Sequence, residues 1–444
     1  MSLLAGAAVR DITPQKPLFL VGYPHVPRTS SGVHDPLLAS ALYLCDGVTP
    51  LLLVAVDILY LSAESSKQCR FAISKATGIP WQNMVISATH THSGPVTHSV
   101  LAWKDDPVVQ PPDPEYLEQF HRGIIESAIA AYRAAEPARL AVTGAKAQGV
   151  GCNRLDPNGS FDSEVGLLAV QRQSDSRLMA VALIYGMHPT VLHEDSSLVS
   201  SDFPYFTRQH LNEVFPGLIT LFHTGPCGNL SPRYHVQSQT FAEAERLGRL
   251  LGQTIAQSLQ ALSHSDFTAE RVLAAAQTWA EVVPNAFPSV ATAEAALHDA
   301  RERYDQLKRT DAPHGPLRTA ECFVFGCEET LTLARAQASG EVARLQHQMR
   351  RAEVQVFRIG DLFLAAWPGE QFVEYGLEIK HRAPGRSFVI SLANGELQGY
   401  IVTPGAAAAG GYEAAFSLFR SESGERLVTA TLNLMQRLLH DPVH

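Results

Sequence analysis

The sequence contains no run of about 18 consecutive apolar residues, so it predicts no transmembrane helix. Basic residues are in the minority: 35 Lys and Arg stand against 44 Asp and Glu, a net charge of −9. This balance argues against binding of nucleic acid or of an anionic membrane surface, because both attract basic patches. The opening stretch, MSLLAGAAVRDITP, lacks the basic segment that begins a signal peptide, and we expect it to form a strand. The protein is therefore expected to be cytoplasmic, or secreted if a signal peptide precedes this sequence.

Cysteine is scarce, and six cysteines in 444 residues do not make a disulfide scaffold. Cys322 and Cys327 are the only close pair. On a strand, their odd separation would point the two thiols to opposite faces, so a shared metal site is not expected. Buried free thiols are the interpretation that we favour, and they suit a reducing cytoplasm.

The common signatures of catalytic sites are also absent. The sequence has no G-x-S-x-G elbow, no G-x-G-x-x-G, no P-loop and no H-E-x-x-H. Hydrophobic residues make up 45% of the chain and charged residues 18%, as in an ordinary globular protein. Any chemistry must therefore come from polar clusters set among apolar elements.

The predicted elements alternate as they do in α/β proteins. Residues 37–62 contain two apolar runs separated by the turn CDGVTP, which predicts two buried strands. Residues 113–137 form an amphipathic helix with Asp113 as its cap. From about 290 to 351 the chain is rich in Ala, Glu, Arg and Gln, which predicts a helical insertion. We find no internal repeat, and we predict one elaborated α/β domain with a mixed sheet over residues 1–444.

The first polar cluster is SATHTHSG, residues 87–94, at the end of an apolar strand. His90 and His92 are two residues apart, so on a strand they share a face and can point into one cavity. Neutral imidazole is the commonest metal ligand, and zinc accepts it readily. The alternative is a strand end whose histidines bond only to backbone groups.

Two further clusters also follow apolar strands. His188 precedes Pro189. Its interpretation as a metal ligand is supported only by the fact that a zinc site draws three or four ligands from separate segments. Ser231 lies in the Gly- and Pro-rich stretch FHTGPCGNLSPRY. It either faces a substrate or caps the next helix, with Pro232 in the first turn.

The last two clusters lie near the C-terminus. Glu370 follows a hydrophobic strand and a Pro-Gly turn, where it is either a ligand or base, or a solvated turn residue. Tyr400 and Tyr412 flank an Ala- and Gly-rich segment. They either face a site or pack with their hydroxyls at a wet edge.

These motifs occur along the chain in a single order: ATHTHSGP, CGNLSPR, PGE, and two tyrosines separated by 11 residues. The flanking segments VRDITP, GVHDPLLASAL, VDILYL, CNR, HPT and SSDFP agree as well. In this order they resemble the neutral (non-lysosomal) ceramidase family of zinc amidases. The resemblance covers nearly the whole chain outside the helical insertion.

The resemblance implies roles for eight residues. Four of them match the family's zinc ligands: His90, His188, Glu370 and Tyr400. Ser231 matches the family's essential serine. Three match residues that line the site and contact the scissile group: His92, Arg154 and Tyr412. Two histidines with a glutamate form a standard catalytic zinc set, so the implied cofactor is Zn²⁺.

The chain also departs from the family's pattern. It ends soon after Tyr412, so we expect only the catalytic domain and no C-terminal β-sandwich domain. The stretch that follows Arg154, LDPNGSFDSEVG, lacks the serine- and tyrosine-bearing segment associated with true ceramidases. Zinc-dependent hydrolysis is therefore a firmer expectation than ceramide as the substrate.

The function implied by the resemblance is zinc-dependent cleavage of an N-acyl, ceramide-like amide in lipid or sphingolipid metabolism. Ser231 would act as the nucleophile or would position a water, and the sequence leaves both open. One alternative is a zinc hydrolase of a small non-lipid amide or an ester. Another is a non-catalytic protein that binds a metal or ligand on the same fold. The expected partner is a small-molecule or lipid substrate, and the sequence does not indicate an oligomeric state.

Overall fold

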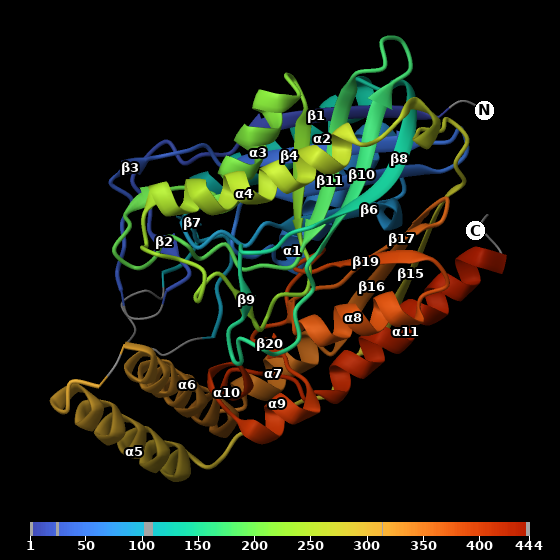
Figure 1. Ribbon diagram of the computed structural model, residues 1–444. Helices are drawn as coiled ribbons and strands as arrows, with labels where there is room; N and C mark the ends of the chain where they lie inside the picture. The colour runs from blue at the N-terminus through green and yellow to red at the C-terminus, as the bar shows by residue number, and fades with distance from the viewer. Residues whose placement is uncertain (1–2, 24–25, 102–109, 313, 441–444) are drawn as a thin grey trace.

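The computed structural model describes residues 3–23, 26–101, 110–312 and 314–440. Two β-sheets lie face to face, and helices cover the outer side of each (Figure 1). Met1 and Ser2, where the predicted first strand would begin, lie outside the described residues. Within those residues, no helix is both long and apolar enough to span a bilayer.

The larger sheet is mixed. Its strand order is β13 (Ile219–Thr224), β11 (Leu178–Tyr185), β10 (Glu164–Arg172), β8 (Glu136–Lys146), β1 (Leu4–Asp11), β4 (Leu38–Cys45), β5 (Pro50–Val56) and β6 (Met84–Ala88). Strands β11 and β13 are parallel, as are β5 and β6, and the other neighbours are antiparallel. The two strands predicted in residues 37–62 are β4 and β5, so this expectation is confirmed.

The smaller sheet packs on the larger one. Its order is β15 (Leu273–Glu281), β16 (Arg351–Ile359), β17 (Leu362–Ala366) and β19 (Arg386–Ile390). Side chains alternate along each strand, so Leu168 and Ala182 of the larger sheet face the smaller sheet. Their neighbours Leu167 and Val181 face the helices instead. Because both faces are buried, these strands read as continuous apolar runs in the sequence.

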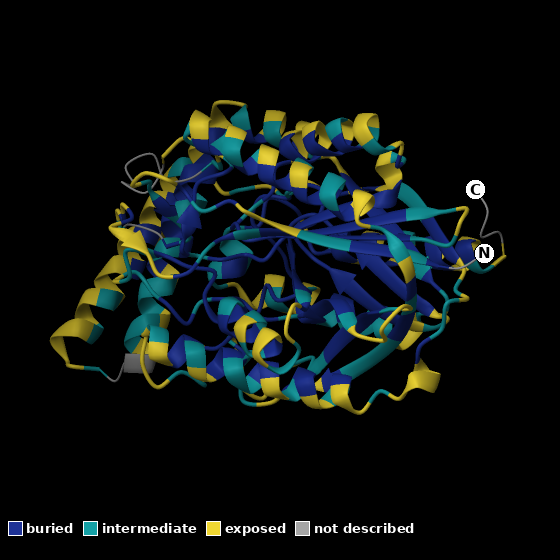
Figure 2. Ribbon diagram, turned by 90° about the horizontal axis from the view of Figure 1, so that it is seen from above, coloured by how far each residue is buried: buried dark blue, intermediate teal, exposed yellow. Residues whose placement is uncertain are grey.

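Three pairs of helices cover the sheets. They are α1 (Ala63–Thr77) with α2 (Pro114–Arg133), α3 (Phe203–Val214) with α4 (Phe241–Gln260), and α8 (Val373–Arg382) with α11 (Glu422–His440). Figure 2 shows that their outer sides are exposed and that the strands between them are buried. Asp113 caps α2 by accepting a hydrogen bond from the Tyr116 N–H, as predicted.

The predicted helical insertion is present as α5 (Val290–Arg309), α6 (His314–Ala338) and α7 (Glu341–Gln348). Helices α5 and α6 form a hairpin that protrudes from the body (Figure 1). The mixed-sheet α/β fold class with a helical insertion is thus confirmed. Cys322 and Cys327 lie in α6, so the argument that assumed a strand was wrong. Both are free thiols as expected, but only Cys327 is buried, and Cys322 is half-buried.

Short elements complete the chain and carry several site residues. The two-stranded pairs are β2 (Leu20–Val21) with β7 (Gly94–Pro95), β3 (Gly32–Val33) with β12 (Leu198–Val199), β9 (Cys152–Asn153) with β14 (Leu230–Ser231), and β18 (Glu370–Gln371) with β20 (Tyr400–Ile401). The short helices are α9 (Pro404–Ala409) and α10 (Tyr412–Ala415). Two 3₁₀ turns cover Trp81–Asn83 and His264–Asp266.

Candidate metal centre

The predicted site residues gather beyond the carboxyl ends of several strands. His90 follows β6, His188 follows β11, and Glu370 begins β18 just after β17 ends. The side chains of all three are almost fully buried. The change from apolar to polar residues at these strand ends therefore marks one shared region, as expected for α/β folds.

His90 and His92 do not lie on a strand, and here the sequence argument was wrong. Strand β6 ends at Ala88, and His90 adopts a left-handed backbone conformation with φ 71°. Such a φ is uncommon for a residue other than glycine. The His90 N–H donates to the Ile58 carbonyl at 2.9 Å, which holds this turn in place. The turn, rather than strand alternation, brings the two rings to 4.9 Å between centroids.

Each of the three histidines uses Nδ1 to bond a backbone carbonyl. The acceptors are Leu59 for His90 at 3.0 Å, Gly22 for His92 at 2.8 Å, and Cys227 for His188 at 2.7 Å. A carbonyl oxygen only accepts, so each Nδ1 carries the proton and a neutral ring leaves Nε2 bare. The sequence offered hydrogen bonds to backbone groups as the alternative to metal binding, and these bonds are present. They also orient each ring so that its Nε2 is available to a ligand.

The bare nitrogens converge on one another and on Glu370. Ring nitrogens of His90, His92 and His188 lie within 4.8 Å of one another. Glu370 Oε2 lies 3.2 Å from His90 Nε2 and 3.1 Å from His188 Nε2. The other oxygen, Oε1, accepts a hydrogen bond from the Tyr60 hydroxyl at 2.8 Å. Glu370 is therefore not a solvated turn residue.

The pKa shifts in this cluster favour neutral His92 and His188 and an ionised Glu370. Burial, aided by the nearby Arg154, lowers the pKa of His188 to about 4. Burial also lowers the pKa of His92 well below its ordinary value, with His90 and His188 acting in the same direction. Burial alone would raise the pKa of Glu370, but His90 and His188 outweigh it and hold that pKa well below the usual range. Nitrogen lone pairs and a carboxylate thus face one another, an arrangement that a cation stabilises.

The donor set fits zinc. Nε2 of His90 and of His92 is buried and makes no hydrogen bond among the described residues. Unpaired polar atoms are costly in a protein interior, so their retention at one point calls for a bound group, whether a metal ion or a polar atom of a substrate. Imidazole nitrogen and carboxylate oxygen are the ligands that zinc prefers, and the backbone bonds at Nδ1 are the supports usual for zinc-binding histidines.

Tyr400, Tyr412 and Arg154 lie beside this cluster. Tyr400 of β20 pairs in register with Glu370 of β18, and its ring lies 6.0 Å from that of Tyr412. The Arg154 guanidinium carbon lies 5.4 Å from the Tyr400 ring centroid. Burial, together with the charge of Glu370, raises the pKa of Tyr400, so its phenol is protonated in the absence of a cation. The sequence had left open an ordinary packing role for both tyrosines, and both do pack in an apolar cluster, with Tyr400 also paired to Glu370.

Ser231 lies in the strand pair that also leads to Arg154. Strand β14 pairs with β9, and the carbonyl of Leu230 accepts a second hydrogen bond from His188 Nδ1 at 2.9 Å. The Ser231 side chain is buried, and its hydroxyl accepts from the N–H of Arg233 at 3.3 Å. The segment after Ser231 is a turn rather than a helix, because α4 begins only at Phe241. The capping alternative is thus not what the structure shows.

Sequence reasoning missed three residues that contact this site: Tyr60, Gly22 and Glu413. Glu413 accepts a hydrogen bond from Arg154 Nε at 2.7 Å. Tyr60 lies within the flanking segment VDILYL and Glu413 follows Tyr412, but no spacing rule marks either of them as a site residue. Gly22 has φ +127°, and a Cβ there would lie 2.6 Å from His92 Nδ1. The sequence shows only that residue 22 is a glycine, and the structure supplies the reason for it.

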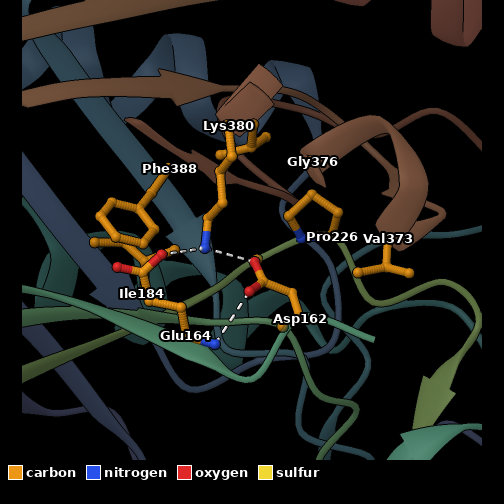
Figure 3. Close-up of a pocket in the computed structure, with 11 residues that line it drawn as sticks. Asp162, Glu164, Ile184, Pro226, Val373, Gly376, Lys380 and Phe388 are labelled. Atoms are coloured by element: carbon orange, nitrogen blue, oxygen red, sulfur yellow. Dashed lines mark hydrogen bonds and ion pairs between the residues drawn. The ribbon is translucent and has the colours of Figure 1, made fainter. Parts of the chain in front are cut away.

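A separate small cavity lies beside the segments that lead to His188 and Cys227, since Gly186 and Pro226 line it (Figure 3). Its volume is about 20 Å³, room for a single water-sized molecule. Figure 3 shows Lys380 pointing into it toward Asp162 and Glu164, at 2.6 and 3.0 Å. The cavity is too small for an organic substrate, and Lys380 forms ion pairs with both of its carboxylates.

Comparison with known proteins adds to this geometry. Residues 3–235, more than half of the chain, match the family model described as neutral/alkaline non-lysosomal ceramidase, N-terminal. The neutral ceramidase from Pseudomonas aeruginosa superposes with a TM-score of 0.76 at 16% identity, covering 99% of this chain and 75% of that one. A ceramidase complexed with C2 gives a TM-score of 0.75 at 17% identity, covering 100% and 76%. At such identities the structures establish a shared fold. No protein with a curated function matches the chain.

Proposed function

The chain belongs to the neutral/alkaline non-lysosomal ceramidase family, and from this membership we propose that it is a zinc-dependent hydrolase of an N-acyl, ceramide-like amide bond. One observation carries the proposal: bare, buried imidazole nitrogens converge on the ionised carboxylate of Glu370. Two histidines and a glutamate form a known catalytic zinc set.

We assign zinc to His90, His188, Glu370 and Tyr400, with His92 as an unligated neighbour. In support, Glu370 Oε2 lies within 3.2 Å of Nε2 of both His90 and His188. The His92 ring lies farther from His188, at 5.9 Å, than the His90 ring does, at 4.8 Å. When bound, zinc polarises an amide carbonyl and lowers the pKa of a bound water or alcohol to about 7.

The protein's own groups divide into proton donors and acceptors. Arg154 and Tyr412 are donors that suit the oxyanion formed when an amide carbonyl is attacked. With Nδ1 donating to Gly22, neutral His92 presents a bare Nε2 and so suits accepting a hydrogen bond from the nucleophile. Ser231 is that nucleophile or the group that positions a water, and both assignments stay within the proposal.

The test is a substrate panel assayed with and without a chelator. Ceramides of varied acyl length, N-acyl amino acids and simple esters are compared for the wild type, Ser231→Ala and Ser238→Ala. Ser238 is an exposed serine on the loop that follows Ser231 and serves as the matched control. We expect hydrolysis of N-acyl amides that the chelator abolishes, a loss of about 100-fold or more in Ser231→Ala, and no change in Ser238→Ala.

Other outcomes would replace the proposal with its alternatives. Faster turnover of esters or of small amides than of any ceramide would assign the same centre to a non-lipid substrate. Full zinc occupancy without hydrolysis of any substrate in the panel would indicate a non-catalytic metal or ligand-binding protein.

A further inference from the structure

The tripeptide Ile58-Leu59-Tyr60, which follows strand β5, contacts two segments of the candidate metal centre that are far apart in sequence. The carbonyls of Ile58 and Leu59 accept from the backbone N–H and from Nδ1 of His90, at 2.9 and 3.0 Å. The next residue, Tyr60, reaches Glu370 instead. One short segment thus holds two groups that are distant in the sequence and adjacent in space.

The contact of Tyr60 is specific to one carboxylate oxygen. Its hydroxyl donates to Glu370 Oε1 at 2.8 Å, while Oε2 of the same carboxylate faces the two histidines. A tyrosine hydroxyl is protonated at neutral pH and donates a single hydrogen bond, so it occupies one lone pair of Oε1 and leaves Oε2 free.

The Tyr60 side chain is itself held in place. Its ring packs beside that of His90, with centroids 5.4 Å apart at a tilt of 58°. Its backbone carbonyl accepts a hydrogen bond from the Thr97 hydroxyl at 2.7 Å. The hydroxyl therefore lies at a fixed point and selects one orientation of the carboxylate. Without it, rotation of the carboxylate would no longer be restrained from that side.

We propose that Tyr60 is a positioning residue for the metal centre, fixing Glu370 so that Oε2 is presented to the cation alongside His90 and His188. The inference rests on the metal site of the proposed function but concerns a residue that does not itself contact the cation. Groups that orient metal ligands in this way typically contribute 10–100-fold to metal affinity or activity.

The experiment measures zinc affinity of the full-length metal-free protein by competition with a chromophoric chelator. Tyr60→Phe removes only the hydroxyl and keeps the ring beside His90. Tyr116→Phe is the matched control, since it removes a buried phenol hydroxyl that has no hydrogen-bond partner in the described structure, on helix α2. We expect zinc to bind Tyr60→Phe about 10–100-fold more weakly than the wild type and Tyr116→Phe with unchanged affinity.

A second measurement separates positioning from a general loosening of the fold. The visible spectrum of the cobalt-substituted protein reports the arrangement of ligands around the ion, and we expect it to change in Tyr60→Phe and not in Tyr116→Phe. Both measurements are made at low temperature, on protein whose far-ultraviolet circular dichroism matches the wild type. Equal zinc affinity and an unchanged cobalt spectrum in Tyr60→Phe would overturn this inference alone. Failure of the wild type to bind zinc would instead overturn the proposed function.

Discussion

Arg154 donates a hydrogen bond from Nε to Oε1 of Glu413 at 2.7 Å, and their side chains are only 9% and 7% exposed. Burial disfavours the charge of Arg154, but the neighbouring Tyr400 and Glu413 outweigh it and raise the pKa of Arg154 well above its ordinary value. Its Nη2 is buried and has no hydrogen-bond partner among the described residues. Glu413 thus holds the guanidinium at one end and leaves a donor free at the other.

We predict that Glu413→Gln lowers the free energy of unfolding by about 3 kcal/mol, because it leaves a buried charge uncompensated. It should also reduce kcat about tenfold or more while zinc stays bound, since a displaced donor no longer meets the oxyanion. Denaturant unfolding, metal analysis and kinetics check this. Glu294→Gln, which breaks an exposed pair with Arg335, is the control and should cost less than about 1 kcal/mol. Equal losses in the two variants would argue against a special role for Glu413.

Gly22→Ala is predicted to displace His92. A Cβ at position 22 would lie 2.6–2.8 Å from three atoms of His92, and φ at +127° strains any other residue there. Because small displacements of a catalytic group are costly, we expect kcat to fall up to about 100-fold. Gly217→Ala is the control, since its φ is +85° and a Cβ there meets nothing within 4 Å. The prediction fails if both variants lose stability alike and both keep full activity.

His223 makes stability depend on pH. It is fully buried, its Nδ1 bonds the Ser87 hydroxyl at 2.8 Å, and burial lowers its pKa to about 3. An unfolded histidine has a pKa of about 6.5, so between pH 6.5 and 3 the unfolded chain binds a proton that the folded chain does not. The stabilisation is present above pH 6.5 and is lost by about 1.4 kcal/mol per pH unit as the pH falls through this window.

The comparison of His223→Gln with the wild type tests this dependence. The variant should show a slope of unfolding free energy against pH that is smaller by about 1.4 kcal/mol per unit between pH 5.5 and 4. Burial raises the pKa of Asp202 to about 7, which acts in the opposite direction but is common to both proteins. His298→Gln is the control, since its side chain is 71% exposed. A slope in His223→Gln equal to that of the wild type would contradict the prediction.

The apolar patterning of the sequence predicts most of the fold. Strands β4 and β5 lie where the two apolar runs predicted them, and helix α2 begins at the predicted Asp-Pro start. Such predictions succeed because burial and capping depend on residues that are close together in the sequence. His90 and His92 show where such reasoning stops. They do converge, but through a left-handed turn at His90 that no periodicity reveals.

The rest of the site depends on contacts that local sequence does not encode. The pairing of Glu370 with Tyr400 involves strands of only two residues, too short to give a periodic signal. The Tyr60 hydroxyl bonds a carboxylate 310 residues away. Only the order of the motifs, through the family resemblance, linked the ligand candidates before the structure did.

The zinc content of the purified protein tests most directly whether His90 and His188 hold a zinc ion. Protein prepared without added metal is compared with the double variant His90→Ala/His188→Ala and with His298→Ala, which replaces an exposed histidine on helix α5. We predict about one zinc ion per chain in the wild type and in His298→Ala, and almost none in the double variant. Substoichiometric zinc in the wild type that does not fall further in the double variant would contradict the account.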